Sequence, residues 1–147
     1  MISKTNGGFL ISQIKQVAGR AFEKILAESG IDEFNGAQGR ILYVLWQTDD
    51  IPIVELSKKT GLAKTTLTSM LDRMENSGLI KRGYSKSDRR QIMITLTEKA
   101  GSLRTEYDKV SATMNEMFYM NFQDEEIELF ESYLIRILNN LSKGEEK

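Results

Sequence analysis

Apolar residues near the start of the chain recur every three to four positions, which is the spacing of an amphipathic helix. The repeating positions are Leu10, Ile14, Val17, Ala21 and Ile25. We expect this helix to end near Gly30, because glycine is common just past a helix. A second apolar cluster, from Ile41 to Trp46, lies between Gly36 and Asp49 and predicts a second helix.

The middle of the chain predicts two short helices joined by a tight turn. Pro52 is the only proline and suits the first turn of a helix, where its missing N–H needs no partner; we expect this helix to run to about Lys59. The residues 60–62 form the turn, with Gly61 supplying the backbone freedom. The next helix, Lys64 to about Ser77, is stopped by Gly78. One of its faces is apolar: Leu67, Met70, Leu71 and Met74.

A β-hairpin is predicted after Gly78. Leu79 to Arg82 and Ile92 to Leu96 have strand length, and Ile92, Ile94 and Leu96 alternate with other residues at a period of two. The loop between them, Gly83 to Gln91, is basic. The order helix, turn, helix, strand, basic loop, strand is that of a winged helix-turn-helix, whose second helix can enter the major groove of DNA.

Two longer apolar stripes occupy the C-terminal part. Thr97 is placed to cap a long helix, with Glu98 near the positive end of the helix dipole. The stripes step by three and four, the spacing of coiled-coil seams: Leu103, Tyr107, Val110, Met114 and Met117, then Ile127, Phe130, Leu134, Ile137 and Leu141. Packing against each other and the first helix would satisfy both stripes in a monomer, but a symmetric dimer also needs such stripes. We expect a homodimer.

Charge is unevenly distributed, although the net charge is only −1. Residues 1–56 hold five basic and seven acidic side chains, residues 57–96 nine and three, and residues 97–147 six and eleven. This pattern favours a phosphate-binding middle carried by an acidic scaffold. A solvated basic face is the other interpretation of charge alone.

The composition removes several classes of chemistry. Cysteine and histidine are absent, which excludes disulfides, thiolate nucleophiles, imidazole bases and the usual zinc ligands. An enzyme would depend on carboxylates such as Asp49 and Asp50 or Glu125 and Glu126, which resemble a loop and a helix start. We expect no catalytic site, no metal and no cofactor. No apolar run has the length of a membrane span, and no secretory signal is visible, so a cytoplasmic protein is expected.

The polar face of helix 64–77 carries the candidate recognition residues. They are short hydroxyls and cations, several of them poor helix formers: Lys64, Thr65, Thr66, Thr68, Ser69 and Arg73. Hydroxyls can bond phosphates or base edges, and Arg73 can contact phosphate or guanine. An ordinary exposed helix face is the alternative.

The chain resembles the MarR/SlyA family of regulators over nearly its whole length. The resemblance rests on the order and spacing of short motifs: Glu55-Leu56, Gly61-Leu62, Thr66-Leu67-Thr68, Leu71-Asp72-Arg73-Met74-Glu75, Gly78-Leu79-Ile80 with Arg82, Asp88-Arg89-Arg90, and Leu96-Thr97. It implies six helices, a small winged hairpin, and a dimer formed by the N- and C-terminal helices. The chain departs from the family at Ala63, where a capping side chain is frequent, and at Ala100, where glycine is frequent.

The resemblance also assigns the wing and the dimer. The aspartate-x-arginine motif falls on Asp88 and Arg90, so Arg90 is expected in the minor groove, whose negative potential attracts a guanidinium. The wing residues are Lys86, Ser87, Asp88, Arg89 and Arg90. The dimerisation residues are Leu10, Ile14, Val17, Phe130, Leu134, Ile137 and Leu141. We expect a single domain, mainly α with a small β-hairpin wing, in which residues 1–34 and 103–147 dimerise and residues 35–102 bind double-stranded DNA.

Family members commonly respond to small, often aromatic, anions. Tyr43, Trp46, Tyr107 and Phe118 are candidates for such an effector pocket, with plain core packing as the alternative. The function predicted is a homodimeric repressor on a pseudo-palindromic operator, released by an effector. The rival is a winged-helix module that binds an acidic protein partner.

Overall fold

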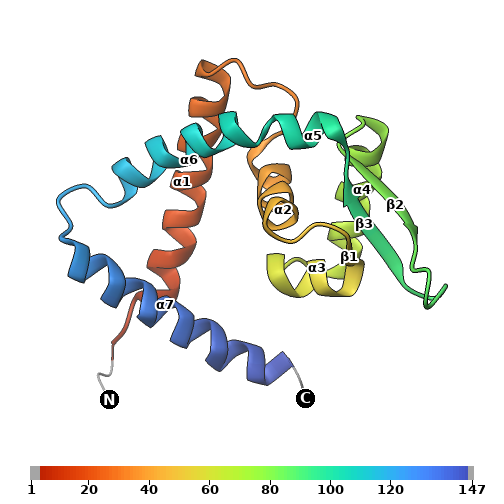
Figure 1. Ribbon diagram of the computed structural model, residues 1–147. Coiled ribbons are helices and arrows are strands. Elements are labelled where there is room, and N and C mark those ends of the chain that lie inside the picture. The colour runs from red at the N-terminus through yellow and green to blue at the C-terminus, as the bar shows by residue number, and fades with distance from the viewer. Residues whose placement is uncertain (1–3, 146–147) are drawn as a thin grey trace. The chain divides into compact units, whose positions relative to one another are not determined.

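A computed structural model describes residues 4–145, so the outermost ends of the two predicted dimerisation segments, residues 1–3 and 146–147, lie outside the described part. The chain forms two compact units, of which the first ends at Ala112 and the second begins at Thr113 (Figure 1). Each unit is described by itself. The boundary falls inside one helix, and residues 103–112 of the predicted C-terminal dimerisation segment belong to the first unit.

The first unit begins with the two predicted helices. Helix α1 spans Gly7–Glu28 and is followed by Gly30 at φ +75°, a left-handed conformation that favours glycine. Helix α2 spans Gly36–Gln47. Its N-terminus is a capping box: the Gln38 amide donates to Asn35 Oδ1 at 2.8 Å, and the Asn35 amide donates to Gln38 Oε1 at 3.1 Å. Both helices were predicted from apolar spacing, and both are confirmed.

The helix-turn-helix is also confirmed. Helix α3 spans Ile53–Thr60 and helix α4 spans Lys64–Asn76, with Gly61 at φ +75° between them and Gly78 at φ +80° after α4. The prediction that Pro52 lies in the first turn of α3 was wrong by one position. Pro52 is the N-cap and belongs to a two-residue strand, β1 (Ile51–Pro52). Strand β1 was not predicted, because two residues carry no periodicity.

Three antiparallel strands form the sheet, in the order β1-β3-β2. Strand β2 spans Ile80–Tyr84 and β3 spans Ile92–Leu96. The hairpin is confirmed, but its first strand was misplaced at both ends: Leu79 precedes it and donates its amide to the Met74 carbonyl at 2.8 Å, closing α4. Figure 1 shows the β2–β3 hairpin projecting past α4 with its loop at the free end.

The long helix expected after Thr97 is two helices, which corrects that prediction. Helix α5 spans Glu98–Ser102 and α6 spans Arg104–Phe118. Thr97 caps α5 as predicted, with Oγ1 accepting from the Ala100 amide at 3.2 Å. At the break, Leu103 donates to the Ala100 carbonyl at 3.1 Å, the tight turn of a helix end. Gly101 and Ser102 are weak helix formers at this point. Residues 4–145 therefore contain seven helices, where the family resemblance implied six.

The core of the first unit joins all of its helices to the sheet. Its buried apolar side chains include Leu26, Phe34, Ile41, Leu42, Leu45, Leu56, Leu67, Leu71, Met74, Leu79, Ile94 and Val110. Trp46 donates its indole N–H to the Ala100 carbonyl at 3.0 Å, and Arg104 Nη1 donates to the Trp46 carbonyl at 3.0 Å. These bonds attach α5 and α6 to the C-terminal end of α2.

The second unit consists of the end of α6 and helix α7 (Asp124–Glu145). Tyr119 donates its hydroxyl to Glu131 Oε2 at 2.6 Å, and its ring packs edge-on against those of Phe118, Phe122 and Phe130. This cluster holds the turn between α6 and α7. Among the described residues, no helix is both long and apolar enough to cross a bilayer.

Candidate nucleic-acid interface

Helix α4 presents a polar face to solvent. Five of the six predicted recognition residues are exposed: Lys64, Thr65, Thr66, Ser69 and Arg73. The opposite face, with Leu67, Leu71 and Met74, is fully buried in the core. Burial of three side chains on one stripe fixes the rotation of α4, and therefore determines which polar groups face outward.

Thr68 differs from the other threonines of this face. It is half-buried, and its hydroxyl donates to the Lys64 carbonyl at 2.8 Å. This bond satisfies a carbonyl within the helix itself. The hydroxyl proton of Thr68 is thus engaged by the backbone, whereas within residues 4–145 the Thr66 hydroxyl forms no such bond.

The N-terminus of α4 has no side-chain cap. Ala63 is the N-cap residue and its methyl group accepts no hydrogen bond. The first amides of a helix point along the axis and carry partial positive charge, which favours an anion such as phosphate. Lys64 adds a full positive charge at the same end, so this end of α4 suits a phosphate group.

Ser85 organises the wing loop, a role that sequence reasoning missed. Its Oγ lies 3.0 Å from Ser87 Oγ and accepts from the amides of Ser87 at 3.3 Å and Asp88 at 3.4 Å. Its own amide donates to the Gln91 carbonyl at 3.1 Å and closes the loop. A serine near the start of a predicted loop is the available signal, since hydroxyls often bond nearby amides in turns.

Arg90 stands at the wing loop with its side chain 92% exposed. Its Nε donates to Asp88 Oδ1 at 3.1 Å and its amide donates to the same oxygen at 3.0 Å. These bonds from Arg90 lower the pKa of Asp88, so the carboxylate stays charged. The aspartate therefore orients a guanidinium that remains open to solvent.

Arg82 joins the wing to α4, and sequence reasoning gave it no role. Its Nη1 lies 2.7 Å from Asp72 Oδ1, its Nη2 lies 2.8 Å from Glu75 Oε1, and its amide donates to Glu75 Oε2 at 3.1 Å. The bonds from Arg82 lower the pKa of Glu75, and those carboxylates raise the pKa of Arg82. The signal in the sequence was two carboxylates three positions apart on one helix, followed by an arginine in the next strand.

Three of the four carboxylates considered for catalysis accept structural hydrogen bonds. Asp49 Oδ1 accepts from the Leu96 amide at 2.9 Å, and Asp50 Oδ1 accepts from the Thr95 hydroxyl at 3.3 Å, so both attach their loop to β3. Glu126 Oε1 accepts from the Gln123 amide at 2.8 Å and caps α7, whose first turn also contains Glu125. These bonds give Asp49, Asp50 and Glu126 structural roles.

The predicted dimerisation residues lie on α1 and α7. Leu10, Ile14, Val17, Ile137 and Leu141 are exposed, while Phe130 and Leu134 are half-buried. Further exposed apolar residues on the same helices were not predicted: Phe9, Ile11, Leu129, Ile135 and Leu138. Each helix thus leaves a broad apolar surface in contact with solvent in the single chain.

The predicted effector residues divide into two groups. The Trp46 and Tyr107 rings lie 5.0 Å apart in the core, and the Tyr43 ring lies 6.2 Å from that of Tyr107 at the surface. Phe118 belongs to the second unit, where it packs on Tyr119. The first three therefore form one aromatic cluster, and Phe118 belongs to another.

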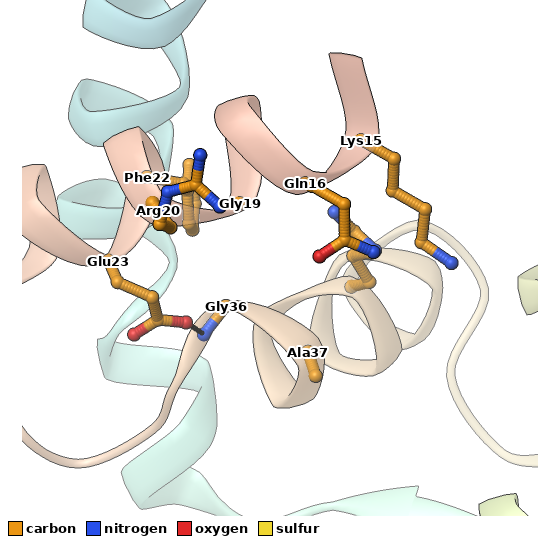
Figure 2. A pocket seen from close by; sticks show the side chains of 9 residues that line it. Lys15, Gln16, Gly19, Arg20, Phe22, Glu23, Gly36 and Ala37 are labelled. Carbon is orange, nitrogen blue, oxygen red and sulfur yellow. Dashed lines mark hydrogen bonds between the residues drawn. The ribbon is translucent and has the colours of Figure 1, made fainter. Parts of the chain in front are cut away.

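A hollow of about 450 Å³ lies between α1 and the start of α2 (Figure 2). Three cationic side chains line it: Lys15, Arg20 and Arg40. Figure 2 shows the Glu23 carboxylate reaching the backbone of Gly36, where the Gly36 amide donates to Glu23 Oε1 at 2.5 Å. The hollow was not predicted, because its residues come together only when α1 packs on α2.

Comparison with sequence families matches residues 34–92 to the MarR family. The transcriptional regulator TtmR of Methylorubrum extorquens is 30% identical over 116 residues, which is 79% of this chain but only 58% of TtmR. The uncharacterized transcriptional regulator YsmB of Bacillus subtilis is 33% identical over 67% of this chain and 68% of its own. The transcriptional repressor YetL of Bacillus subtilis is 29% identical over 137 residues, which are 88% of this chain and 77% of YetL.

Solved structures share the fold. A MarR mutant from E. coli in complex with operator DNA aligns with a TM-score of 0.79 and 25% identity, covering 89% of this chain and 92% of that one. Reduced AbfR bound to DNA aligns with a TM-score of 0.70 and 28% identity, covering 90% of this chain and 88% of AbfR. These likenesses confirm the predicted fold class, mainly α with a small β-hairpin wing. The family match covers α2, α3, α4, β2 and the wing loop, and it ends at the first residue of β3.

Proposed function

The chain belongs to the MarR family of transcriptional regulators. We propose that it is a cytoplasmic homodimer that binds double-stranded DNA sequence-specifically and represses transcription. Its relatives are named as regulators of transcription, in agreement with the expectation of a regulator and not an enzyme. Helix α4 of each protomer enters the major groove, and the wing enters the adjacent minor groove. The two half-sites of a pseudo-palindromic operator then lie about 10 base pairs apart.

The observation that carries this proposal is the orientation of Arg90. Its side chain is 92% exposed, yet its Nε is held by Asp88 Oδ1 at 3.1 Å. The residue lies at the free end of the hairpin, and α4 carries an exposed polar face. Asp88 binds both the Nε and the backbone amide of Arg90, so the exposed guanidinium is restricted in direction without being buried. The arrangement fits a group prepared for the minor groove.

The test is selection of bound duplexes from a random pool at moderate salt, with Arg90→Ala as the comparison. We expect a palindrome to be enriched and binding to weaken in Arg90→Ala. The dependence of affinity on salt should become shallower, because the variant brings one positive charge fewer to the DNA and releases fewer counterions. An unchanged salt dependence would argue against the wing contact. A folded dimer that enriches no duplex would favour the acidic protein partner.

The dimer in this proposal is formed through α1 and α7. Exposed apolar faces on both helices support it, since large apolar patches on soluble proteins mark interaction sites. We expect Val17→Glu combined with Leu141→Glu to shift the protein from dimer to monomer in sedimentation analysis. A double variant that remains dimeric would place the interface elsewhere.

We also propose release by a small aromatic or anionic effector. The cationic lining of the hollow between α1 and α2, with Lys15, Arg20 and Arg40, supports an anion. Benzoate is a suitable probe, because it combines a ring with a carboxylate. We expect benzoate to weaken operator binding by the wild type and to lose its effect in Arg40→Gln; equal effects on both proteins would exclude this hollow.

A further inference from the structure

Tyr84 and Ile92 form an exposed apolar pair on the wing shaft, the paired strands β2 and β3 below the wing loop. They are directly opposite each other on β2 and β3. Tyr84 is 72% exposed and Ile92 is 36% exposed. Large apolar side chains in this position add little to the core, which raises the question of what covers them in function.

The pair faces the recognition helix. Side chains alternate along a strand, so Ile80, Arg82 and Tyr84 share one face of β2. Ile80 is buried on this face, and Arg82 reaches Asp72 and Glu75 of α4 from it. The face that carries Tyr84 is therefore the face turned toward α4.

A hollow of about 300 Å³ confirms this placement. It is lined by Glu75, Arg82, Gly83, Tyr84 and Ile92, so it lies between α4 and the wing shaft. Arg82 and Glu75 are paired with each other at 2.8 Å. The Arg82 guanidinium also pairs with Asp72 at 2.7 Å, so both charged groups of the lining are engaged in ion pairs. The tyrosine ring, its hydroxyl and the isoleucine side chain are what the hollow offers to a ligand. Among residues 4–145, no hydrogen bond engages the Tyr84 hydroxyl.

We infer that this hollow receives one sugar-phosphate strand of the DNA duplex, with deoxyribose packed on Tyr84 and Ile92 and a phosphate oxygen accepting from the Tyr84 hydroxyl. The inference rests on the proposed function. If α4 occupies the major groove and Arg90 the adjacent minor groove, the strand that separates the two grooves must cross the gap between α4 and the wing. The apolar part of this lining, Tyr84 and Ile92, matches the apolar face of a deoxyribose.

This contact positions the duplex without reading its sequence. Sugar and phosphate contacts fix the register of a protein on DNA but carry no base information. A tyrosine hydroxyl also neutralises no phosphate charge, so its removal should leave the salt dependence of binding unaltered. These two properties distinguish Tyr84 from Arg90 and from the polar residues of α4.

The experiment measures the affinity of Tyr84→Phe and Tyr84→Ala for the selected operator and for a scrambled duplex, at several salt concentrations. We expect Tyr84→Phe to bind both duplexes about 3- to 10-fold more weakly, the effect of one lost hydrogen bond, and Tyr84→Ala to lose more. The salt dependence stays as in the wild type. Tyr133→Phe is the matched control: Tyr133 is also an exposed tyrosine, 45% exposed, but lies on α7. We expect it to bind as the wild type.

Arg90→Ala separates failure of this inference from failure of the proposed function. If both Tyr84 variants bind as the wild type while Arg90→Ala is impaired, DNA binding stands and the contact at Tyr84 is refuted. A loss confined to the operator would mean that Tyr84 reads bases, which also contradicts a sugar-phosphate contact. If the wild type binds neither duplex, the proposed function fails and this inference fails with it.

Discussion

Gly39 of α2 lies against the ring of Tyr107 in α6, so closely that a Cβ atom on residue 39 would be 2.8 Å from Cε2 of that ring and 3.2 Å from Cε2 of Phe34. The contact lies in the aromatic cluster, where the Tyr107 and Phe34 rings are 5.9 Å apart and Tyr107 also packs on Trp46. Burial raises the pKa of Tyr107, so the phenol stays neutral there. The missing side chain at position 39 allows α2 and α6 to approach each other.

We expect Gly39→Ala to destabilise the protein. Helix propensity alone predicts a gain of up to about 1 kcal/mol in the free energy of unfolding, but forcing a methyl group into this contact should cost about 1–3 kcal/mol. Urea unfolding followed by the fluorescence of Trp46, the only tryptophan, measures the difference. Gly101→Ala is the control, since a Cβ there meets nothing within 4 Å. A stabilised Gly39→Ala would show that the contact relaxes without cost.

Thr66 and Thr68 should differ in their importance for DNA binding. The Thr68 hydroxyl already donates to the Lys64 carbonyl at 2.8 Å, whereas Thr66 is exposed without such a bond. We expect Thr66→Val to weaken operator binding by about 3- to 10-fold, as expected for one hydrogen bond, and Thr68→Val to change it less than about 2-fold. Titration of labelled operator measures both. The reverse order would show that the Thr68 hydroxyl leaves the backbone to bind DNA.

Arg82→Gln should lower stability in a pH-dependent way. The pKa of Glu75 in the folded state lies below its ordinary 4.5 because of the bonds from Arg82. A carboxyl with a depressed pKa contributes stability above pH 4.5 and loses it as the pH falls through the lower folded value. The difference in unfolding free energy between wild type and variant should therefore narrow in acid.

Urea unfolding at neutral pH and at acid pH below 4.5 tests this expectation. Lys59→Gln is the control, because Lys59 forms an exposed i,i+4 pair with Glu55 at 3.5 Å that contributes little stability. A difference between wild type and Arg82→Gln that is independent of pH would refute the role of Glu75.

Tyr119 should ionise at unusually high pH. Burial and the neighbouring Glu131 carboxylate raise its pKa from 10.0 to about 12. A group whose pKa is raised by folding contributes stability below pH 10 and loses it as the pH rises through about 12. Titration of tyrosinate absorbance in wild type and Tyr119→Phe isolates this one phenol. A difference between the two curves that titrates near pH 10 would show that the pKa of Tyr119 is not raised in solution.

The sequence by itself determined the elements whose causes are local. The apolar spacing of α1, α2, α4 and α7, the turn at Gly61, the stop at Gly78 and the cap at Thr97 all depend on residues within a few positions of each other. The same holds for the pairing of Asp88 with Arg90, two residues apart. Interactions of this kind are visible in the sequence because chain connectivity already places the partners together.

Only the tertiary structure decided the features that join distant segments. Strand β1 exists because Ile51 pairs with Ile94, and Asp49 reaches the Leu96 amide across 47 positions. The break at Leu103 occurs where Arg104 is held by the Trp46 carbonyl. Packing also turned Tyr84 toward α4 and brought Arg82 to two carboxylates. The energy of such contacts depends on which surfaces meet, and single-sequence periodicity does not contain that information.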